Sequence, residues 1–509
     1  MRKLLNKNIF VLIILIFIGL VVHFKSFQMV PYGDDWRFIY NYFTHEEVVA
    51  NFSPLPGLLA YLAPYGPSAL TIGFLYQVFG SKYYIFYLMP LIGKIITSFV
   101  IFLMLKNISN ELKKRDIIVS FLSAAFFLVG ATGIQAIDWA FHINVYISMF
   151  IFALGIFFQI RFFNYKKEKD LLLALFFSLF AIVFAPFRFL SVTLMVPLID
   201  LIFLIRNKAK DIFLIILLKN LIFAISIFVF FLIGLFGHSP QDFYSPFPIR
   251  DAVKLVMAEP LLSAKTFLHW IGSTIMPFYP GPGINSFITG AVFLLILFTV
   301  FSKYRGKYII LGSVLYFIPL FLMWMITPTR IIDSGDRYLP LAFFGLSFLI
   351  GVICLYANKF KNIFIGVLLI LVLIQALSTM RIYSYWISIG RGADFTLPEQ
   401  EKIMSHFLVP QTEQKIIYLD FEENPVFLQS IEFGIGYRVA VLSGTKGLDN
   451  FPRQLDNKGE LVKFIKSELS RGESIDQIVN KIYAFQYKNK VFQDITDTFD
   501  AELKKQFSK

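Results

Sequence analysis

Hydrophobic positions dominate the first three quarters of the chain and recur in long runs. The first run, residues 9–22, follows a basic N-terminal segment, and bulky residues rather than a small-residue cleavage site follow it. This pattern favours an uncleaved membrane anchor over a signal peptide. Ten further runs have about the length that spans a bilayer: 83–105, 117–134, 143–160, 170–186, 189–205, 212–237, 284–302, 308–327, 338–358 and 363–380. The pattern predicts an α-helical polytopic membrane protein with about eleven transmembrane helices.

Basic residues are distributed unequally between the loops that join these runs. If alternate short loops lie in the cytoplasm with the N-terminus, this side holds 19 basic residues, against nine in the much longer outward loops. Because positive charge is retained on the cytoplasmic side, the N-terminus is predicted to be cytoplasmic and the C-terminus extracytoplasmic. The basic clusters at 161–169 and 206–210 both belong inside, so the chain must turn back near Pro186. That turn leaves Arg188 on the outer side.

Two of the outward loops are long, residues 23–82 and 238–283. The first contains an apolar, proline-broken segment at 53–61, which is typical of short helices in the membrane interface. The second contains an amphipathic piece at 251–270. Loops of this length are usually functional lids or binding loops, and a lipid-facing belt that includes Trp270 is the alternative. Residues 1–380 are therefore predicted to form one transmembrane module with two large outward loops.

The pattern changes after residue 380. Residues 381–509 contain 17 basic and 18 acidic residues, and no metal-ligand spacing, phosphate-binding loop or nucleophile motif. About 110 residues is enough for a small soluble domain, so we expect an extracytoplasmic α/β domain for recognition or stabilisation. Its short periodicities predict strands at 415–419 and 437–442, helices at 461–469 and 475–482, and a β-hairpin at 483–495 with its turn at 488–490.

Composition supports this class and excludes others. A hydrophobic content of 57%, 61 phenylalanines and a mean hydropathy of +0.67 are incompatible with a soluble globular protein. The tail is nearly neutral, so the formal net charge of +13 comes from the membrane module and reflects its cytoplasmic loops, not a nucleic-acid surface. The single cysteine, Cys354, lies within an apolar run, so no disulfide framework exists.

The first candidate for chemistry is an acidic pair, Asp34-Asp35, which stands among aromatic residues directly after the first run. Acidic groups at the bilayer edge are costly to desolvate and are functional candidates. A carboxylate beside apolar walls suits a general base with an adjusted pKa. Capping of a helix that begins near Trp36 is the alternative, and the residues alone leave the two open.

Two further outward loops carry polar candidates. Asp138 and His142 are spaced i, i+4 and would share a helix face, where they could bind an acceptor hydroxyl or a divalent cation, or simply satisfy each other. Arg330 and Arg337 lie in the last outward loop, where a guanidinium fork suits a phosphate. Pairing of Arg337 with Asp333 or Asp336 is the alternative.

Together these features resemble the C-type (GT-C) superfamily of integral membrane glycosyltransferases, which includes protein O-mannosyltransferases and the aminoarabinose transferase of lipid A. The resemblance covers the layout of residues 1 to about 380, and its motifs are short. The matching positions are the acidic pair Asp34-Asp35 in the first outward loop, Asp138 in the second, and Arg337-Tyr338-Leu339-Pro340 at an outer helix start.

The resemblance implies a hexosyltransferase-type enzyme in the plasma membrane that moves a sugar from a polyprenyl-phosphate carrier to an acceptor at the outer face. The acceptor would be a surface polysaccharide, a teichoic acid, a lipid or a protein. Asp34 or Asp35 would deprotonate the acceptor hydroxyl in an inverting displacement. Arg337, with Arg330, Arg188 and Tyr338, would hold the donor phosphate. The resemblance implies no particular cofactor, and a divalent cation at Asp138 and His142 is optional.

Two other functions fit part of the sequence. An O-antigen polymerase or ligase would have many spans and outward arginines, but would not need the acidic pair or the long tail. A transporter would show inverted repeats and charges deep within its spans. Lys94 and Lys219 are the clear lysines within runs, no internal repeat is evident, and Lys219 lies near enough to the cytoplasmic end to extend there.

Overall fold

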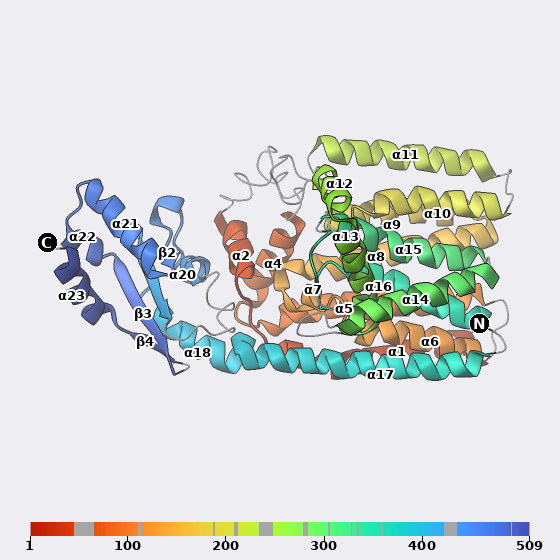
Figure 1. The fold of residues 1–509 in the computed structure, drawn as a ribbon, viewed down its shortest axis with the longest axis horizontal. Helices are drawn as coiled ribbons and strands as arrows, with labels where there is room; N and C mark the ends of the chain where they lie inside the picture. Colours follow the sequence, from red (N-terminus) through yellow and green to blue (C-terminus); the bar gives the residue numbers. More distant parts are fainter. Residues whose placement is uncertain are drawn as a thin grey trace. The chain divides into compact units, whose positions relative to one another are not determined.

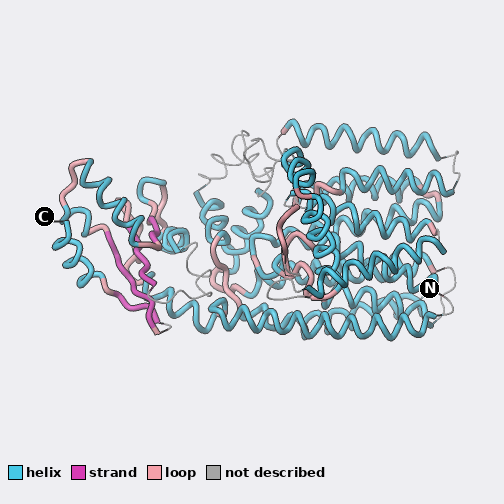
Figure 2. Tube along the Cα trace, in the orientation of Figure 1, coloured by secondary structure: helices cyan, strands magenta, loops and turns pink. Residues whose placement is uncertain are grey.

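The computed structural model describes residues 2–44, 66–109, 114–186, 189–207, 212–233, 248–277, 284–303, 306–326, 328–332, 335–357, 360–421, 435–489 and 491–507. The chain forms two compact units, which we describe separately. The helical unit comprises Met1–Phe27, Asn51–Ser68 and Ile85–Ser384. The mixed unit comprises Gln28–Ala50, Ala69–Tyr84 and Tyr385–Lys509, and it contains the β-strands (Figures 1 and 2).

Each of the eleven predicted runs coincides with a helix. Seven helices within the described residues are long and apolar enough to cross a membrane, so the chain is a multi-pass helical membrane protein. Four others, α6, α9, α10 and α16, have 16 or 17 residues, and that they also cross remains a prediction. The helices are α1 (Arg2–His23), α5 (Tyr84–Ile108), α6 (Lys114–Val129), α8 (Ile143–Tyr165), α9 (Glu168–Phe184), α10 (Val192–Asn207), α11 (Phe213–Leu232), α14 (Ile284–Lys303), α15 (Lys307–Ile326), α16 (Pro340–Tyr356) and α17 (Lys361–Trp386).

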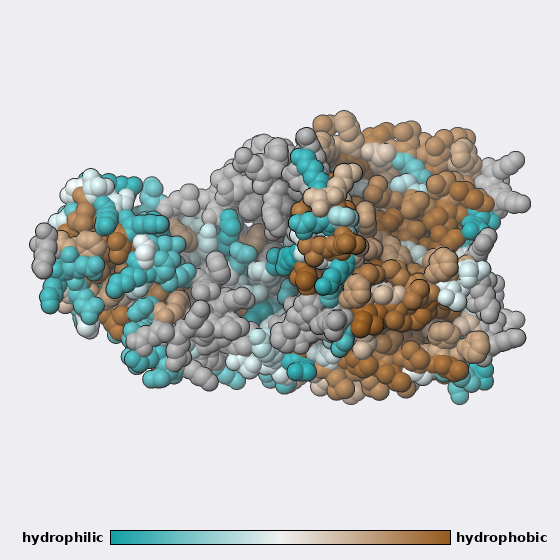
Figure 3. All heavy atoms as spheres, viewed as in Figure 1, coloured by the Kyte–Doolittle hydropathy of each residue, from teal (hydrophilic) through white to brown (hydrophobic). Residues whose placement is uncertain are grey.

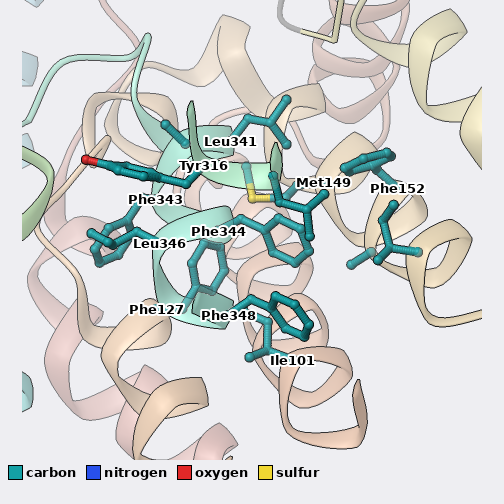
Figure 4. Close-up of a cluster of buried hydrophobic side chains, with 14 of the residues drawn as sticks. Ile101, Phe127, Met149, Phe152, Tyr316, Leu341, Phe343, Phe344, Leu346 and Phe348 are labelled. Carbon is teal, nitrogen blue, oxygen red and sulfur yellow. The ribbon is translucent and has the colours of Figure 1, made fainter. Parts of the chain in front are cut away.

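The long helices are apolar on all sides because one side packs in the unit and the other meets lipid. Figure 4 shows the packed side, where Phe127 of α6 meets Phe343 and Phe344 of α16 at ring-centroid distances of 5.8 and 6.2 Å. Gly345 brings α16 against α15, since a Cβ there would lie 2.2 Å from the carbonyl oxygen of Leu315. The opposite side carries exposed leucines and phenylalanines, which give the helical unit its apolar surface in Figure 3.

One group of polar side chains inside the helical unit closes the C-terminal end of α6. The last carbonyls of a helix lack partners within the helix and need them elsewhere when buried. Here α1, α5 and α17 supply them, and this fixes the start of the segment that leads to Asp138. The bonds are His23 Nε2 to Leu128 O (2.9 Å), Thr379 Oγ1 to Val129 O (2.7 Å), Lys94 Nζ to Gly130 O (2.8 Å) and Ala131 N to Gln375 Oε1 (2.8 Å).

The second lysine within the runs also has a structural partner. Lys219 of α11 lies 2.5 Å from Asp200 of α10, and Gln159 of α8 donates to the other oxygen of Asp200 at 2.5 Å. Both charged side chains are buried. The expectation that Lys219 extends to the cytoplasmic surface is therefore wrong. Its ammonium group pairs with a carboxylate on the neighbouring helix instead of extending to water at the membrane surface.

We expect Lys219→Leu to destabilise the protein by about 3–5 kcal/mol, because it leaves the Asp200 carboxylate buried without its cation. The thermal midpoint of the purified protein in detergent measures this loss. The double variant Asp200→Leu/Lys219→Leu should recover most of it, since replacing a whole buried pair by apolar groups is often close to neutral. A midpoint as low in the double variant as in the single one would show that the pair itself is not the cause.

Between its long helices the helical unit forms shorter elements in the segments predicted to face outward. They are α7 (Gln135–Asp138), the 3-10 turn η3 (Ala140–His142), α12 (Pro248–Ala258) and α13 (Pro260–Ile275). The predicted amphipathic piece 251–270 is thus two helices. Pro260 occupies the first turn of α13, where its missing N–H is tolerated, and it cannot continue α12. Trp270 is fully buried, and its Nε1 donates to Arg330 O at 2.9 Å. It is therefore not part of a lipid-facing belt.

The mixed unit contains a four-stranded sheet in the order β2-β1-β3-β4. Strands β2 and β3 run parallel to β1, with Ile416 opposite Ile482, and β4 is antiparallel to β3. Its strands and helices are α2 (Asp34–Thr44), α4 (Gly66–Phe79), α18 (Ala393–Met404), β1 (Ile416–Phe421), α20 (Ile435–Ser443), β2 (Arg453–Leu455), α21 (Lys458–Ser470), α22 (Ile475–Val479), β3 (Ile482–Lys488), β4 (Val491–Asp494) and α23 (Thr496–Phe507).

Most of the tail elements follow the predicted pattern, with one exception. The strand at 415–419, the helix at 461–469 and the hairpin at 483–495 correspond to β1, α21 and the pair β3 and β4. The helix predicted at 475–482 is shorter than expected: α22 ends at Val479, and Ile482 begins β3. The strand predicted at 437–442 is wrong, because these residues belong to helix α20. Its buried residues include Ile435, Arg438 and Val439, a helical spacing that the short β-branched run concealed.

Asp500 of α23 gives the mixed unit a pH dependence. Burial raises the pKa of Asp500 from 3.8 to about 6; Lys504 opposes this shift, and Asp497 and Asp494 add to it. A folded-state pKa above the unfolded value stabilises the fold below the unfolded pKa, and this stabilisation is lost as pH rises through about 6. We expect Asp500→Asn to raise the calorimetric midpoint of the full-length protein at pH 7, by an amount that shrinks toward pH 4.

Asp476→Asn is the matched control for this prediction. It removes a carboxylate that pairs with Lys504 at 2.9 Å and should not raise the midpoint. A midpoint gain for Asp500→Asn that is the same at both pH values would contradict the assignment.

Candidate active site

The acidic pair lies in the first turn of α2, which begins at Asp34. Gly33 precedes the helix with φ of 55°, a left-handed conformation that favours glycine. Asp35 Oδ2 accepts the backbone N–H of Tyr32 at 3.0 Å, as the second half of a capping box does. Trp36 Nε1 donates to Pro31 O at 3.1 Å and closes the same turn. The pair is therefore held by a tight, locally bonded turn.

The two carboxylates occupy different environments. Asp35 is fully buried, whereas Asp34 is half-buried. The capping interpretation therefore fits Asp35, whose oxygen bonds a backbone N–H. Asp34 is the more exposed member of the pair.

Helix α2 is held by α20 and α4 of the same unit. The Trp36 ring meets Tyr76 and Tyr83 edge-on, at 5.7 and 6.0 Å. The guanidinium of Arg438 lies 5.1 Å from the Trp36 ring centroid, and the arginine is only 4% exposed. Burial lowers the pKa of Arg438, and a hydrogen bond with Tyr83 opposes that shift. The buried guanidinium of Arg438 thus packs on Trp36, the residue that follows the acidic pair.

A second arginine holds the segment before the acidic pair. The Arg391 guanidinium lies 3.8 Å from the Tyr32 ring centroid and 5.2 Å from that of Trp386. Val30 N donates to Arg391 O at 3.3 Å, and Met29 bridges to Gly392. Sequence reasoning missed Arg391 and Arg438, because both are far from the acidic pair along the chain and neither has a motif.

In the helical unit, the structure brings the second and last outward loops together. Gln135 N donates to Gly335 O at 3.0 Å. Gly133, with φ of 74°, lets Pro340 approach, since a Cβ at this position would lie 2.6 Å from the proline ring. The Arg337 guanidinium then lies over the Trp139 ring, 4.5 Å from its centroid. Two predicted candidate regions, around Asp138 and Arg337, thus form one cluster, which we call the arginine cluster (Trp139, Arg330, Asp336, Arg337 and Tyr338).

Tyr338 and Asp336 order the arginines. The buried Tyr338 ring has the guanidinium groups of Arg330 and Arg337 at 5.8 and 5.7 Å. Asp336 accepts the backbone N–H of Tyr338 at 3.0 Å and lies 3.4 Å from Arg330. Two acidic residues were predicted as partners of Arg337. Asp333 lies outside the described residues, and Asp336 lies within ion-pair distance of Arg330. Half of the Arg330 side chain remains exposed, so its charge is accessible.

Asp138 and His142 do not share a helix face. Helix α7 ends at Asp138, Trp139 is extended with φ of −102° and ψ of 104°, and His142 ends the separate turn η3. The i, i+4 expectation is wrong because Trp139 breaks the helix to place its ring, which His142 meets at 5.6 Å. Both residues are buried. Within the described residues no group of three His, Cys, Asp or Glu side chains could hold a metal ion.

Two further predictions fall on parts of the chain that the structure does not describe. These are Arg188, a candidate for the donor phosphate, and the apolar segment 53–61.

Comparisons with known proteins find similar solved structures but no similar sequence. No family model and no curated protein matches the sequence. The crystal structure of ArnT from Cupriavidus metallidurans, bound to undecaprenyl phosphate, is similar with a TM-score of 0.47 and 11% identity, over 96% of this chain and 94% of that one. Because these values do not establish a shared function, the proposal below rests on the residues themselves.

Proposed function

We propose that the chain is a C-type membrane glycosyltransferase that moves a sugar from a polyprenyl-phosphate donor to an acceptor at the outer face of the plasma membrane. The observation that carries the proposal is the acidic pair at the start of α2, directly after the first span, with Asp35 buried and Asp34 half-buried. A site beside the bilayer suits a donor whose carrier is a lipid. The acceptor arrives from the aqueous side.

Asp34 is the general base in this proposal. Its carboxylate takes the proton of the acceptor hydroxyl as that oxygen attacks the anomeric carbon of the sugar. The bond between that carbon and the phosphate oxygen breaks, and its electron pair leaves with the polyprenyl phosphate. A single displacement inverts the anomeric centre and needs no covalent intermediate. Asp35 positions the turn.

The arginine cluster is the proposed site for the donor phosphate. Arg337 and Arg330 would offset the charge that grows on the leaving phosphate. The Tyr338 ring lies near both guanidinium groups, so its proposed role is to order them. Arg188 remains a third candidate, and Asp138 and His142 remain candidates for the acceptor or for an optional cation.

The proposal requires eleven spans, a cytoplasmic N-terminus and an extracytoplasmic C-terminal domain. We expect alkaline phosphatase fused after Lys509 to be active, because this reporter works only outside the cytoplasm. The same fusion placed in the basic loop after α8, for example after Lys167, should be inactive. Activity of the second fusion with inactivity of the first would reverse the orientation on which the outward loops depend.

The rival functions draw no specific support from the described residues. A transporter would use charged groups within its spans, but Asp200 and Lys219 satisfy each other, and Lys94 closes the end of α6. A polymerase or ligase would act on a polyprenyl pyrophosphate and would leave the acidic pair without a role.

Transfer of label from a defined donor tests the proposal. Membranes that contain the protein would be incubated with radiolabelled polyprenyl-phosphate glucose, mannose, galactose and aminoarabinose, and label would be followed into aqueous or lipid products. Transfer from one of these donors, absent from membranes without the protein, is the expected result. Transfer only from a polyprenyl pyrophosphate would favour the polymerase function instead.

A further inference from the structure

The mixed unit contains a cleft of about 550 Å³ at the carboxyl ends of its parallel strands. Three polar residues line it: Asp420 is next to last in β1, Asp456 directly follows β2, and Gln486 lies near the end of β3. The volume falls within the range of about 300–1,000 Å³ that is usual for small-molecule sites. The cleft belongs to the mixed unit, and its lining residues include neither the acidic pair nor any member of the arginine cluster.

The topology of the sheet explains why a cleft forms there. The connection after β1 contains α20, which packs on one face of the sheet. The connection after β2 contains α21 and α22, which pack on the other face (Figure 1). Adjacent parallel strands whose connections leave on opposite faces create a crevice beyond their carboxyl ends, and open α/β sheets bind ligands at this point.

The lining combines an aromatic wall with fixed hydrogen-bond acceptors. Tyr418 and Phe499 stack with ring centroids 5.0 Å apart and planes 15° from parallel. Gln486 Nε2 donates to Asp420 Oδ2 at 3.3 Å, and Gln454 Nε2 donates to Asp456 Oδ1 at 2.7 Å. Amide groups therefore orient the two carboxylates before any ligand arrives.

The charges of the cleft select the class of ligand. Among the described residues that line the cleft, Asp420, Asp456 and Glu502 carry carboxylates and Lys458 is the single lysine, so phosphates, nucleotides and acidic polymers are disfavoured. Within the described residues these carboxylates do not converge as a metal site. A neutral sugar fits this chemistry: its hydroxyl groups are donors for carboxylates and amides, and the C–H face of its ring packs on aromatic carbon.

We infer that this cleft binds a neutral saccharide of one or two hexose units. The mixed unit would then hold a carbohydrate site of its own, distinct from the site of transfer. This binding does not depend on the proposed reaction, because a chain without transferase activity would still bind the sugar.

Isothermal titration of the full-length protein in detergent tests the inference. The probes are maltose, cellobiose and N,N′-diacetylchitobiose, with glucose 6-phosphate and calcium chloride as contrasting ligands. At least one disaccharide should bind with a millimolar or lower Kd. Asp420→Asn, which keeps the size of the side chain and loses one strong acceptor, should weaken that binding at least tenfold, the loss of about 1.5–3 kcal/mol typical of one charge-assisted hydrogen bond.

Glu413→Gln is the matched control, since Glu413 is an exposed carboxylate elsewhere on the mixed unit, paired with Lys415. It should bind the disaccharide as the wild type does. Binding of none of the three disaccharides, equal binding by Asp420→Asn and the wild type, or saturable binding of glucose 6-phosphate or calcium at the cleft would each overturn the inference. Failure of the transfer assay, by contrast, would leave the expected titration unchanged.

Discussion

Asp34→Asn should lower the rate of sugar transfer by roughly 10²- to 10⁴-fold, the range that loss of a general base produces. Asparagine keeps the size of the side chain and can still accept a hydrogen bond, but it cannot take the proton of the acceptor hydroxyl. The expected effect is on kcat, because the substrate contacts remain. The assay is single-donor transfer by purified protein, with each variant matched for expression and thermal midpoint.

Asp35 provides the control within the same turn. In Asp35→Asn the amide oxygen can still accept the N–H of Tyr32, so most of the activity should remain. Asp35→Ala removes that acceptor and should lower both the thermal midpoint and the activity. If Asp35→Asn loses as much activity as Asp34→Asn is expected to lose, and Asp34→Asn stays active, the roles of the two residues are exchanged. If both asparagine variants stay active, the pair only caps α2.

Arg337→Lys should raise the apparent KM for the donor by about tenfold to a hundredfold. Lysine keeps the positive charge but loses the planar guanidinium, which lies over Trp139 and has the geometry to bind two phosphate oxygens. A charge-assisted hydrogen bond contributes about 1.5–3 kcal/mol, which corresponds to that range of affinity. The expected change is in the donor KM, with a smaller change in the acceptor KM.

Arg381→Lys is the matched control, because Arg381 is an exposed arginine of α17 outside the arginine cluster. It should leave the kinetics as in the wild type. Unchanged donor kinetics in Arg337→Lys would remove the phosphate role and leave Arg337 as a structural partner of Trp139. A loss of thermal stability without a change in KM would lead to the same conclusion.

The membrane helices could be predicted because their signal is local. A run of apolar residues of bilayer length must form a helix to satisfy its backbone, whatever it packs against. The start of α2 could also be predicted from the sequence, because Gly33, Asp34 and Asp35 are adjacent and form the turn themselves. The bonded role of Asp35 and the greater exposure of Asp34 could not be predicted, because burial depends on residues elsewhere in the fold.

The predictions that were wrong concern residues whose conformation depends on contacts between distant segments. Helix α20 has a short β-branched pattern, and its helical state follows from burying Ile435, Arg438 and Val439 against the rest of the mixed unit. Trp139 leaves the helical conformation because its ring lies beneath the guanidinium of Arg337, about two hundred residues later in the sequence. No periodicity within a short window contains such information.

One measurement tests the central claim most directly. Purified protein in lipid nanodiscs would be given the polyprenyl-phosphate sugar selected by the membrane assay together with its acceptor, and the free polyprenyl phosphate and the new glycoside would both be quantified. Equal amounts of the two products from the wild type, with almost none from Asp34→Asn, is the predicted result. Label that stays on the carrier lipid, or equal product formation by the wild type and Asp34→Asn, would contradict the account.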